Sequence, residues 1–222
     1  MQLAFIFATS FLIALSGALM PGPMLAVTIK ESLEQGWPAG VFISIGHGLA
    51  EIALLIVFAL GMSKVLQAQW ITAVVGTVGG LVLLLMGIDM MSSVLRGKIG
   101  QITLSDQGEQ VFAGKISTTS FKRALGAGIV VSVANPTWII WWLTIGVMYV
   151  TQAMKYGWLG LGFFYTGHIL ADFTWYVFIA FIVATGKRFL TPATYNWIMA
   201  GCGLLMVLLA LFFLVQGIQA VL

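Results

Sequence analysis

Charged residues are scarce in this sequence. Asp, Glu, Lys and Arg together make up 8% of the 222 residues, whereas hydrophobic residues make up 60%. A soluble domain carries about 25% charged residues, so a water-exposed surface cannot be built from this composition. The composition therefore excludes a soluble globular protein.

Cysteine is almost absent as well. The single Cys202 has no partner for an internal disulfide, which argues against thiol–disulfide electron transport. The sequence also shows no ATP-binding segment, phosphate-binding loop or metalloprotease motif, and nothing in it implies a cofactor. We therefore expect no enzymatic activity, and any pumping must use an ion gradient or a partner.

Long apolar runs dominate the chain instead. A helix needs about 20 apolar residues to cross the hydrocarbon core of a bilayer. The runs are too long for barrel strands and lack a two-residue alternation, so they are predicted to be helices. We predict an all-α integral membrane protein with six transmembrane helices, at residues 3–29, 38–63, 70–95, 124–150, 157–184 and 193–219.

The net charge of +3 predicts membrane orientation rather than nucleic-acid binding, because the basic residues lie between the apolar runs. Basic loops favour the cytoplasmic side. We therefore expect a multi-pass protein of a prokaryotic-type plasma membrane, with both termini outside. The loops after the second and fourth runs hold only Lys64 and Lys155, whereas those after the first, third and fifth hold Lys30, Arg96, Lys98, Lys115, Lys122, Arg123, Lys187 and Arg188.

One short motif occurs twice. Residues 46–51 read GHGLAE and residues 167–172 read GHILAD. With three spans on either side of segment 96–123, the second half enters the membrane in the opposite direction to the first. We therefore predict two inverted three-helix repeats, 1–95 and 124–222, joined by a cytoplasmic linker at 96–123. In transporters of this kind the binding site lies near the midplane between the halves.

Each predicted half begins with an interrupted helix. The first run contains Pro21-Gly22-Pro23 and the fourth contains Asn135-Pro136. Proline lacks an N–H and clashes with the carbonyl four residues earlier, so we expect free carbonyls at Gly17 and Leu19 in the first run and at Ser132 in the fourth. A lone proline is typical of a simple kink, but two interruptions in corresponding helices favour a functional break.

Both histidines of the chain lie beside acidic residues deep in the predicted spans. Glu51 and Asp172 lie near the middle of their helices, where a charge costs roughly 2.5–3.5 kcal/mol and usually marks function. His47 stands four residues before Glu51 and His168 four before Asp172, so each pair shares a helix face. The chain has no other histidine. Packing alone does not predict this pairing.

Three roles are open for these pairs. They can be structural hydrogen bonds that hold helices together, worth about 0.6 kcal/mol each. They can carry protons, because carboxylate and imidazole side chains both bind and release a proton. They can also enclose a divalent transition metal, for which two imidazoles and two carboxylates are suitable ligands. The last two roles are both transport functions.

With these features the chain resembles the lysine exporter (LysE) family, which also includes the homoserine and threonine exporters. The resemblance covers nearly the whole chain. The sequence departs from the family pattern at Ala50-Glu51, where Gly-Asp is common in the family, and at Thr137, where Lys is common. The matching segments are Pro21-Gly22-Pro23, the glycines from Gly36 to Gly48, Gly79-Gly80 through Gly87-Ile88, and Phe121 through Gly128 leading to Asn135-Pro136.

The resemblance implies a secondary transporter that exports small amino acids or their derivatives from the cytoplasm in exchange for protons. Its partners would be the amino-acid substrate, protons and the lipid bilayer, and a homo-oligomer is left open. Relatives in the wider superfamily export divalent metals, which is the alternative function. Pro21, Gly22, Pro23, Asn135 and Pro136 would be substrate-binding or gating elements, and His47, Glu51, His168 and Asp172 would couple protons or, in the alternative, bind metal.

Overall fold

The computed structural model describes residues 1–19, 22–59, 69–95, 118–186 and 191–220. These residues are helical almost throughout, and no strand occurs among them. The elements are α1 (Gln2–Ala18), α2 (Pro23–Gln35), α3 (Pro38–Ala59), α5 (Gln69–Val74), the π-helical η1 (Val75–Gly79), α6 (Gly80–Leu95), α8 (Thr118–Val133), α9 (Pro136–Trp141), the π-helical η2 (Trp142–Gly146), α10 (Val147–Met154), α11 (Gly157–Gly186) and α12 (Pro192–Gln219).

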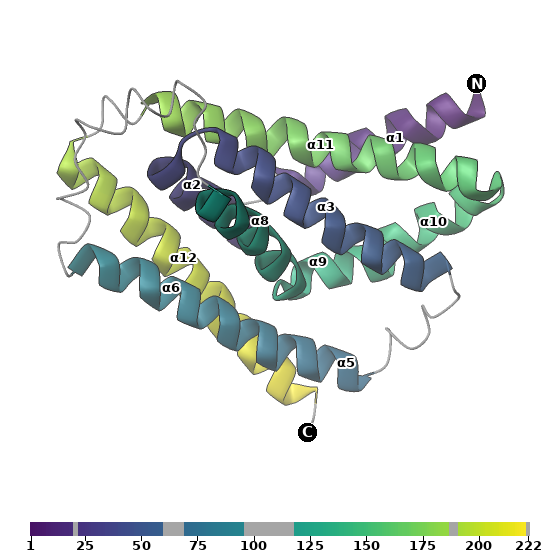
Figure 1. The fold of residues 1–222 in the computed structure, drawn as a ribbon. Coiled ribbons are helices and arrows are strands. Elements are labelled where there is room, and N and C mark those ends of the chain that lie inside the picture. The colour runs from purple at the N-terminus through teal and green to yellow at the C-terminus, as the bar shows by residue number, and fades with distance from the viewer. Residues whose placement is uncertain (20–21, 60–68, 96–117, 187–190, 221–222) are drawn as a thin grey trace.

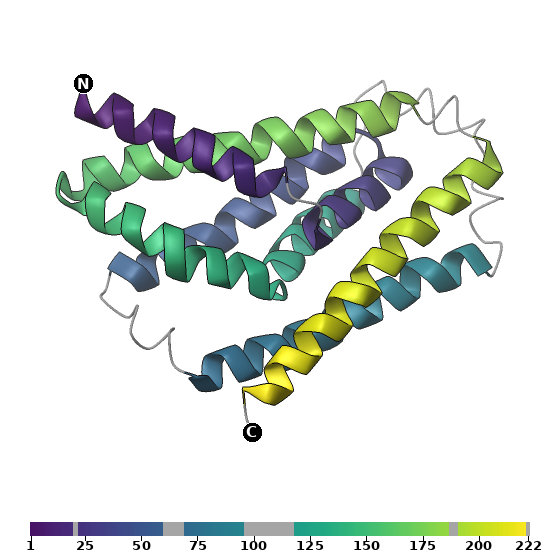
Figure 2. The ribbon, with the colours of Figure 1, turned by 180° about the vertical axis from the view of Figure 1, so that it is seen from behind.

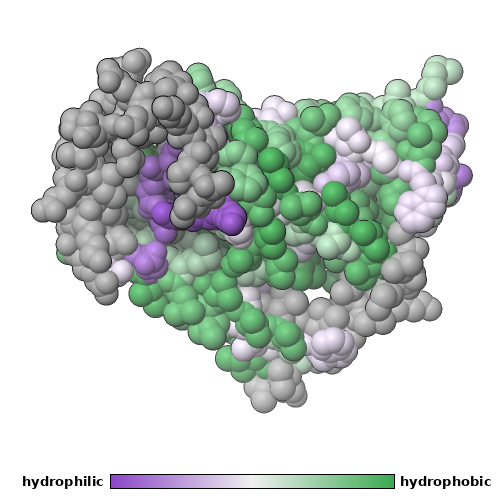
Figure 3. Space-filling model, viewed as in Figure 1, coloured by the Kyte–Doolittle hydropathy of each residue, from purple (hydrophilic) through white to green (hydrophobic). Residues whose placement is uncertain are grey.

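Several of these helices are long and apolar enough to cross a membrane. By length and composition they are Pro38–Phe58, Gly157–Gly186 and Asn196–Gln219, and the bent pair α1 and α2 would make a fourth. Most of the described surface is hydrophobic on the face shown in Figure 3, and hydrophilic residues gather mainly at the left of this view, with a smaller group at its right edge. Apolar patches of this extent mark a membrane or protein contact. The prediction of an all-α, multi-pass membrane protein therefore agrees with the fold.

The first interruption lies where the prolines predicted it. Helix α1 ends at Ala18, where Leu19 N–H donates to the Leu15 carbonyl at 3.0 Å. Helix α2 then begins at Pro23, and the two helices are bent by 77° relative to each other. Proline suits the first position of a helix because the N–H it lacks would have no partner there. Pro21 lies outside the described residues.

The second interruption separates α8 from α9. Asn135 has extended backbone angles, and its Oδ1 accepts hydrogen bonds from the Thr137 N–H at 3.1 Å and the Thr137 hydroxyl at 2.6 Å. This cap starts α9 at Pro136. The expectation that the Ser132 carbonyl is free is wrong, because the Asn135 N–H donates a hydrogen bond to this carbonyl at 3.1 Å. The chain turns back within the break and satisfies that carbonyl locally.

The helices pack in pairs that connect the first part of the chain to the second. Helix α1 lies along α11, α8 lies along α3, and α6 lies along α12, while α3 and α11 also contact each other. In Figures 1 and 2, α6 and α12 lie together on the opposite side of the molecule from α1 and α11. Exchanging the two predicted halves preserves this pairing scheme. The linker predicted at 96–123 lies mostly outside the described residues, and α8 begins within its last residues at Thr118.

The glycine of each doubled motif sits at one of these helix crossings. A Cβ added to Gly46 on α3 would overlap with the Leu125 backbone of α8, and one added to Gly167 on α11 would overlap with the Phe7 backbone and Ser10 Oγ of α1. Only a residue without a side chain permits such an approach of two helix backbones. The first residue of Gly-His-x-Leu-Ala-acid therefore serves packing.

Gly167→Ala is expected to lower the melting temperature of the solubilised protein, because its methyl group would overlap with α1. Such overpacking typically costs about 1–3 kcal/mol, and each kcal/mol corresponds to roughly 2–4 °C in a chain of this size. Gly162→Ala, on the same helix, is the matched control because nothing lies within 4 Å of its added Cβ. Equal melting temperatures for the two variants would show that this helix crossing tolerates a side chain.

Candidate functional site

The two histidine–acid pairs come together where α3 and α11 meet. His47 and Glu51 come from α3, and His168 and Asp172 come from α11. All four are buried, with exposed fractions of 6% for His47, 0% for Glu51, and 5% each for His168 and Asp172. The fold thus collects both histidines of the chain and two of its carboxylates in one place. We refer to these four residues as the midplane cluster.

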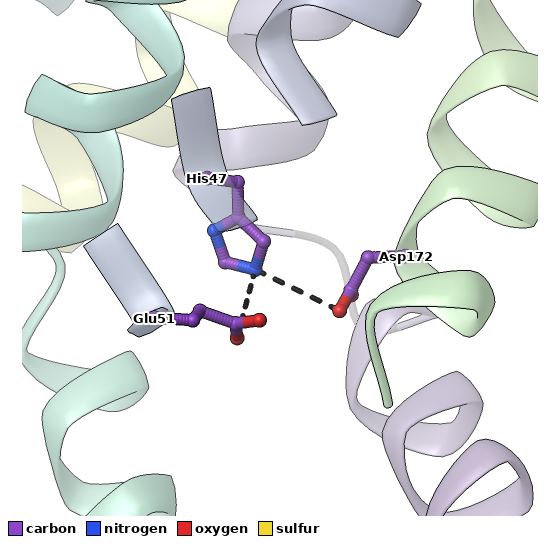
Figure 4. Close-up of side chains that lie close together, drawn as sticks. All are labelled: His47, Glu51 and Asp172. Atoms are coloured by element: carbon purple, nitrogen blue, oxygen red, sulfur yellow. Dashed lines mark ion pairs between the residues drawn. The ribbon is translucent and has the colours of Figure 1, made fainter. Parts of the chain in front are cut away.

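Glu51 is the centre of the midplane cluster. Its Oε1 lies 2.9 Å from His168 Nε2 and 3.2 Å from His47 Nε2. Asp172 Oδ2 is farther away, at 3.6 Å from His168 Nε2 and 3.8 Å from His47 Nε2. Figure 4 shows the His47 ring pointing between the two carboxylates. The shortest contact therefore joins the two halves of the chain, whereas the helical spacing had paired each histidine with the acid of its own helix.

A serine beside the second break orients His47. The Ser132 hydroxyl donates to the Gly128 carbonyl at 2.6 Å and lies 2.6 Å from His47 Nδ1. A hydroxyl has one proton to donate, so His47 Nδ1–H must donate to Ser132. The other nitrogen, Nε2, then faces Glu51 Oε1. That contact is attractive when a further proton lies on His47 or on Glu51, so the pair is a candidate for binding an exchangeable proton.

Three tryptophans from the segment after the second break surround the midplane cluster. Trp138 Nε1 donates to Glu51 Oε1 at 3.4 Å. The rings of Trp141 and Trp142 lie with their centroids 4.8 and 5.1 Å from that of His168, and Trp142 is fully buried. From the sequence these tryptophans could equally face lipid. The break at Asn135-Pro136 matters here because α9 carries Trp138 to the carboxylate.

The first break approaches one of these tryptophans, Trp141. A Cβ added to Gly17, near the end of α1, would lie 3.5 Å from Trp141 Nε1. Both interrupted helices are thus connected to the midplane cluster through α9. Sequence reasoning had treated the breaks and the histidine–acid pairs as separate features, and it missed Ser132 as a partner of His47. The only signal for Ser132 was its place directly before the predicted break.

Some polar atoms of the midplane cluster have no hydrogen-bond partner among the described residues. They are Glu51 Oε2, His168 Nδ1 and Asp172 Oδ2. A buried polar atom without a partner costs about 1–3 kcal/mol, and such atoms concentrate at functional positions. The arrangement can therefore accept a further proton or a small polar species.

The donor set also suits a metal ion. One ligand atom each from His47, Glu51 and Asp172 lie within 4.8 Å of one another. Zinc binds nitrogen and oxygen ligands at about 2.0–2.2 Å in a tetrahedron, which places ligand atoms about 3.4 Å apart. Side-chain adjustments of about 1 Å would therefore close these three ligands around a divalent ion.

Residues 15–217 match the model of the LysE type translocators. The chain belongs to the LysE family. The resemblance inferred from the proline breaks and glycines is thereby confirmed, and members of this family are translocators, consistent with the expectation of no enzymatic activity.

Two curated relatives of this LysE family member are also similar to it. The "Putative amino acid efflux protein YcgF" of Bacillus subtilis is 23% identical over 219 residues, which cover 98% of this chain and 99% of the relative. The "Uncharacterized membrane protein PA4757" of Pseudomonas aeruginosa is 25% identical over 171 residues, covering 77% of this chain and 74% of the relative. No solved structure matches. Family and relatives together support an exporter in a membrane.

Proposed function

We propose that this LysE family member exports small amino acids or their derivatives from the cytoplasm in exchange for protons, and that the midplane cluster binds those protons. The proton required between His47 Nε2 and Glu51 Oε1 carries this proposal. A buried group that must gain and lose a proton as the carrier changes access is the basic element of proton antiport. The amino-acid efflux assigned by name to the Bacillus subtilis relative supports the substrate.

The proposed architecture has six spans in two inverted repeats, with both termini outside and the linker in the cytoplasm of a prokaryotic-type cell. The reciprocal packing of α1 on α11 and of α8 on α3 supports the repeat. The concentration of basic residues after the first, third and fifth apolar runs supports the orientation. Under this proposal the midplane cluster lies at the interface of the two repeats, where inverted-repeat transporters bind their substrates.

The two breaks are proposed to bind or gate the substrate. Gly22 precedes α2, and among the described residues no side chain caps that helix, so the N–H groups that follow Pro23 and the positive dipole end can meet a carboxylate. Asn135 caps α9 with its own side chain, so we assign Asn135 and Pro136 to gating rather than to carboxylate binding. Pro23 would fix the bend that keeps the α2 terminus open, and Pro21, which lies outside the described residues, is proposed to act in substrate binding or gating with it.

Proton exchange also answers an energetic requirement. Exporting a cation works against a membrane potential of 100 mV by about 2.3 kcal/mol per charge. A cationic amino acid leaving the cell therefore needs a coupled source of energy. An inward proton movement through the midplane cluster supplies that energy without ATP.

Divalent transition-metal export is the second candidate function, and the close grouping of His47, Glu51 and Asp172 ligand atoms favours it. In this case the metal is the transported substrate. A strain that expresses the protein, challenged in parallel with toxic amino acids and with cadmium, nickel or zinc, separates the two candidates. Resistance to metals alone would rule out amino-acid export, and resistance to amino acids alone would rule out metal export.

The metal candidate predicts a loss of binding from each member of the midplane cluster. His47→Ala, His168→Ala, Glu51→Gln and Asp172→Asn should each weaken zinc binding about 10-fold or more, because each removes a ligand or the support of one. Calorimetric titration of the solubilised protein with zinc measures the effect. Glu34→Gln is the control, because Glu34 pairs with Arg123 outside the cluster. Unchanged zinc binding in all four cluster variants would contradict metal transport through this cluster.

A further inference from the structure

A second polar site lies between α2 and α6, away from the residues of the midplane cluster. A cavity of about 290 Å³ opens there, lined by residues of both helices. Pockets for drug-sized ligands span about 300–1,000 Å³, so this cavity suits a smaller molecule, of the size of one amino acid. Its lining residues are Val27, Lys30 and Glu31 from α2 and Leu85, Met86, Asp89 and Met90 from α6.

The cavity lies between α2 and the helix pair formed by α6 and α12. Helices α6 and α12 form a pair on one side of the molecule (Figures 1 and 2), and α12 also packs against α2. Across the cavity, Lys30 Nζ of α2 lies 3.2 Å from Asp89 Oδ2 of α6. An ion pair therefore ties α2, the second part of the broken helix, directly to α6.

The walls of the cavity carry charges of both signs beside apolar side chains. Lys30 supplies a cation, and Asp89 and Glu31 supply carboxylates. The Glu31 side chain is only 5% exposed, and Arg123 holds one of its oxygens at 3.0 Å. Glu31 is thus already paired with Arg123. Lys30 and Asp89 are therefore the two groups that can give up their mutual contact and pair with a ligand instead. The apolar part of the wall comes from Val27, Leu85, Met86 and Met90.

We propose that this cavity binds a zwitterionic amino acid with an apolar side chain. The ligand carboxylate would pair with Lys30 Nζ and its ammonium group with the Asp89 carboxylate. Binding would then separate the Lys30–Asp89 pair, in which the Asp89 side chain is 65% exposed, and would give each of the two charges a new partner of opposite sign. The ion pair between α2 and α6 would separate only when a molecule that carries both charges binds.

This proposal rests on the proposed amino-acid export and names its substrate class. Lys30, in α2, belongs to the group of basic residues that the sequence predicts on the cytoplasmic side, where an exported molecule must first bind. A metal ion or a simple amine would pair with Asp89 alone and leave Lys30 without a partner. The site therefore discriminates by requiring two opposite charges at one spacing.

Cysteine labelling with substrate protection tests the site. Cys202 is first replaced, giving Cys202→Ala, and Met86→Cys or Leu85→Cys then places a single thiol in the cavity wall. Leu95→Cys is the matched control, because Leu95 is exposed on the same helix and does not line the cavity. We expect L-leucine and L-alanine to slow maleimide labelling at positions 86 and 85 but not at 95. Failure of both cavity thiols to react, or reaction without protection, would overturn the proposal.

Single-charge analogues and an Asp89 variant separate a binding site from a structural ion pair. L-leucinamide lacks the carboxylate and N-acetyl-L-leucine lacks the ammonium group, so each should need about 10-fold or more higher concentration for half-protection, as the loss of a charged hydrogen bond does. Asp89→Asn should weaken protection by L-leucine to a similar extent. Equal protection by all three compounds, or by L-leucine with and without Asp89→Asn, would contradict the assignment.

Flux measured in parallel keeps this proposal distinct from the export function. The same L-leucine and L-alanine are loaded into proteoliposomes that contain the wild-type protein. Flux without protection at positions 85 and 86 would overturn the cavity site and leave amino-acid export intact. Protection without flux of either amino acid would support the site and count against export.

Discussion

Glu51→Gln or Asp172→Asn should leave amino-acid exchange intact while abolishing accumulation driven by a pH gradient. Either substitution keeps the size of the side chain and removes its titratable proton. Glu51 makes the shorter contacts with both histidines, so we expect Glu51→Gln to cause the larger loss of pH-driven accumulation. Proteoliposomes measure both activities: exchange of labelled amino acid across equal pH, and uptake against a gradient after a pH jump. Proton-driven uptake in the uncoupled variant should fall to the level of empty liposomes.

Glu34→Gln is the matched control for this experiment. It also replaces a carboxylate by an amide, but its partner Arg123 keeps the contact with Glu31. We expect wild-type coupling in this control. If both cluster variants also kept wild-type uptake after the pH jump, the midplane cluster would hold helices together without carrying protons.

Gly22→Leu should abolish transport while the protein still inserts into the membrane. Gly22 is the residue before α2, and no side chain occupies the N–H groups of its first turn. A leucine side chain would crowd the space in which a substrate carboxylate meets that helix terminus. Leucine is a poor N-cap, but the penalty of about 1 kcal/mol is too small to prevent folding. Initial rates of amino-acid exchange, normalised to inserted protein, measure the loss.

Gly162→Leu is the corresponding control on α11. Its added side chain has open space, since nothing lies within 4 Å of a Cβ at that position, and we expect wild-type exchange. Wild-type exchange in Gly22→Leu as well would show that the first break is a bend with no role in substrate binding.

Much of the helix pattern was predictable because it follows from composition and proline chemistry. Apolar runs gave the positions of α3, α11 and α12, and Pro23 and Pro136 begin helices as their missing N–H groups require. The sequence could not show that a break can satisfy its own carbonyls. The Ser132 carbonyl accepts a hydrogen bond from the Asn135 N–H, and this contact depends on how the chain turns between two helices.

The candidate site was predictable in its members but not in its connections. The doubled motif named His47, Glu51, His168 and Asp172, because helical spacing places each histidine beside an acid. That spacing acts within one helix, whereas the 2.9 Å contact of His168 with Glu51 joins two helices. The crossing of α3 and α11 decides it, and no local pattern encodes that crossing. The same limit applies to Ser132 and Trp138, which reach the cluster from the two opposite sides of the second break.

The packing of α1 on α11 has a consequence for biosynthesis. Helix α1 is synthesised before the other described helices, and its packing partner α11 is made only after α3, α6 and α8. Ser10 of α1, which α11 helps to bury at the crossing with Gly167, must therefore wait in the bilayer or the insertion machinery while most of the chain is synthesised. Helix α3 likewise packs on α8, which is made later. The helices α1, α2 and α3 therefore cannot complete their packing as a unit, and the protein must assemble largely after its helices have been inserted.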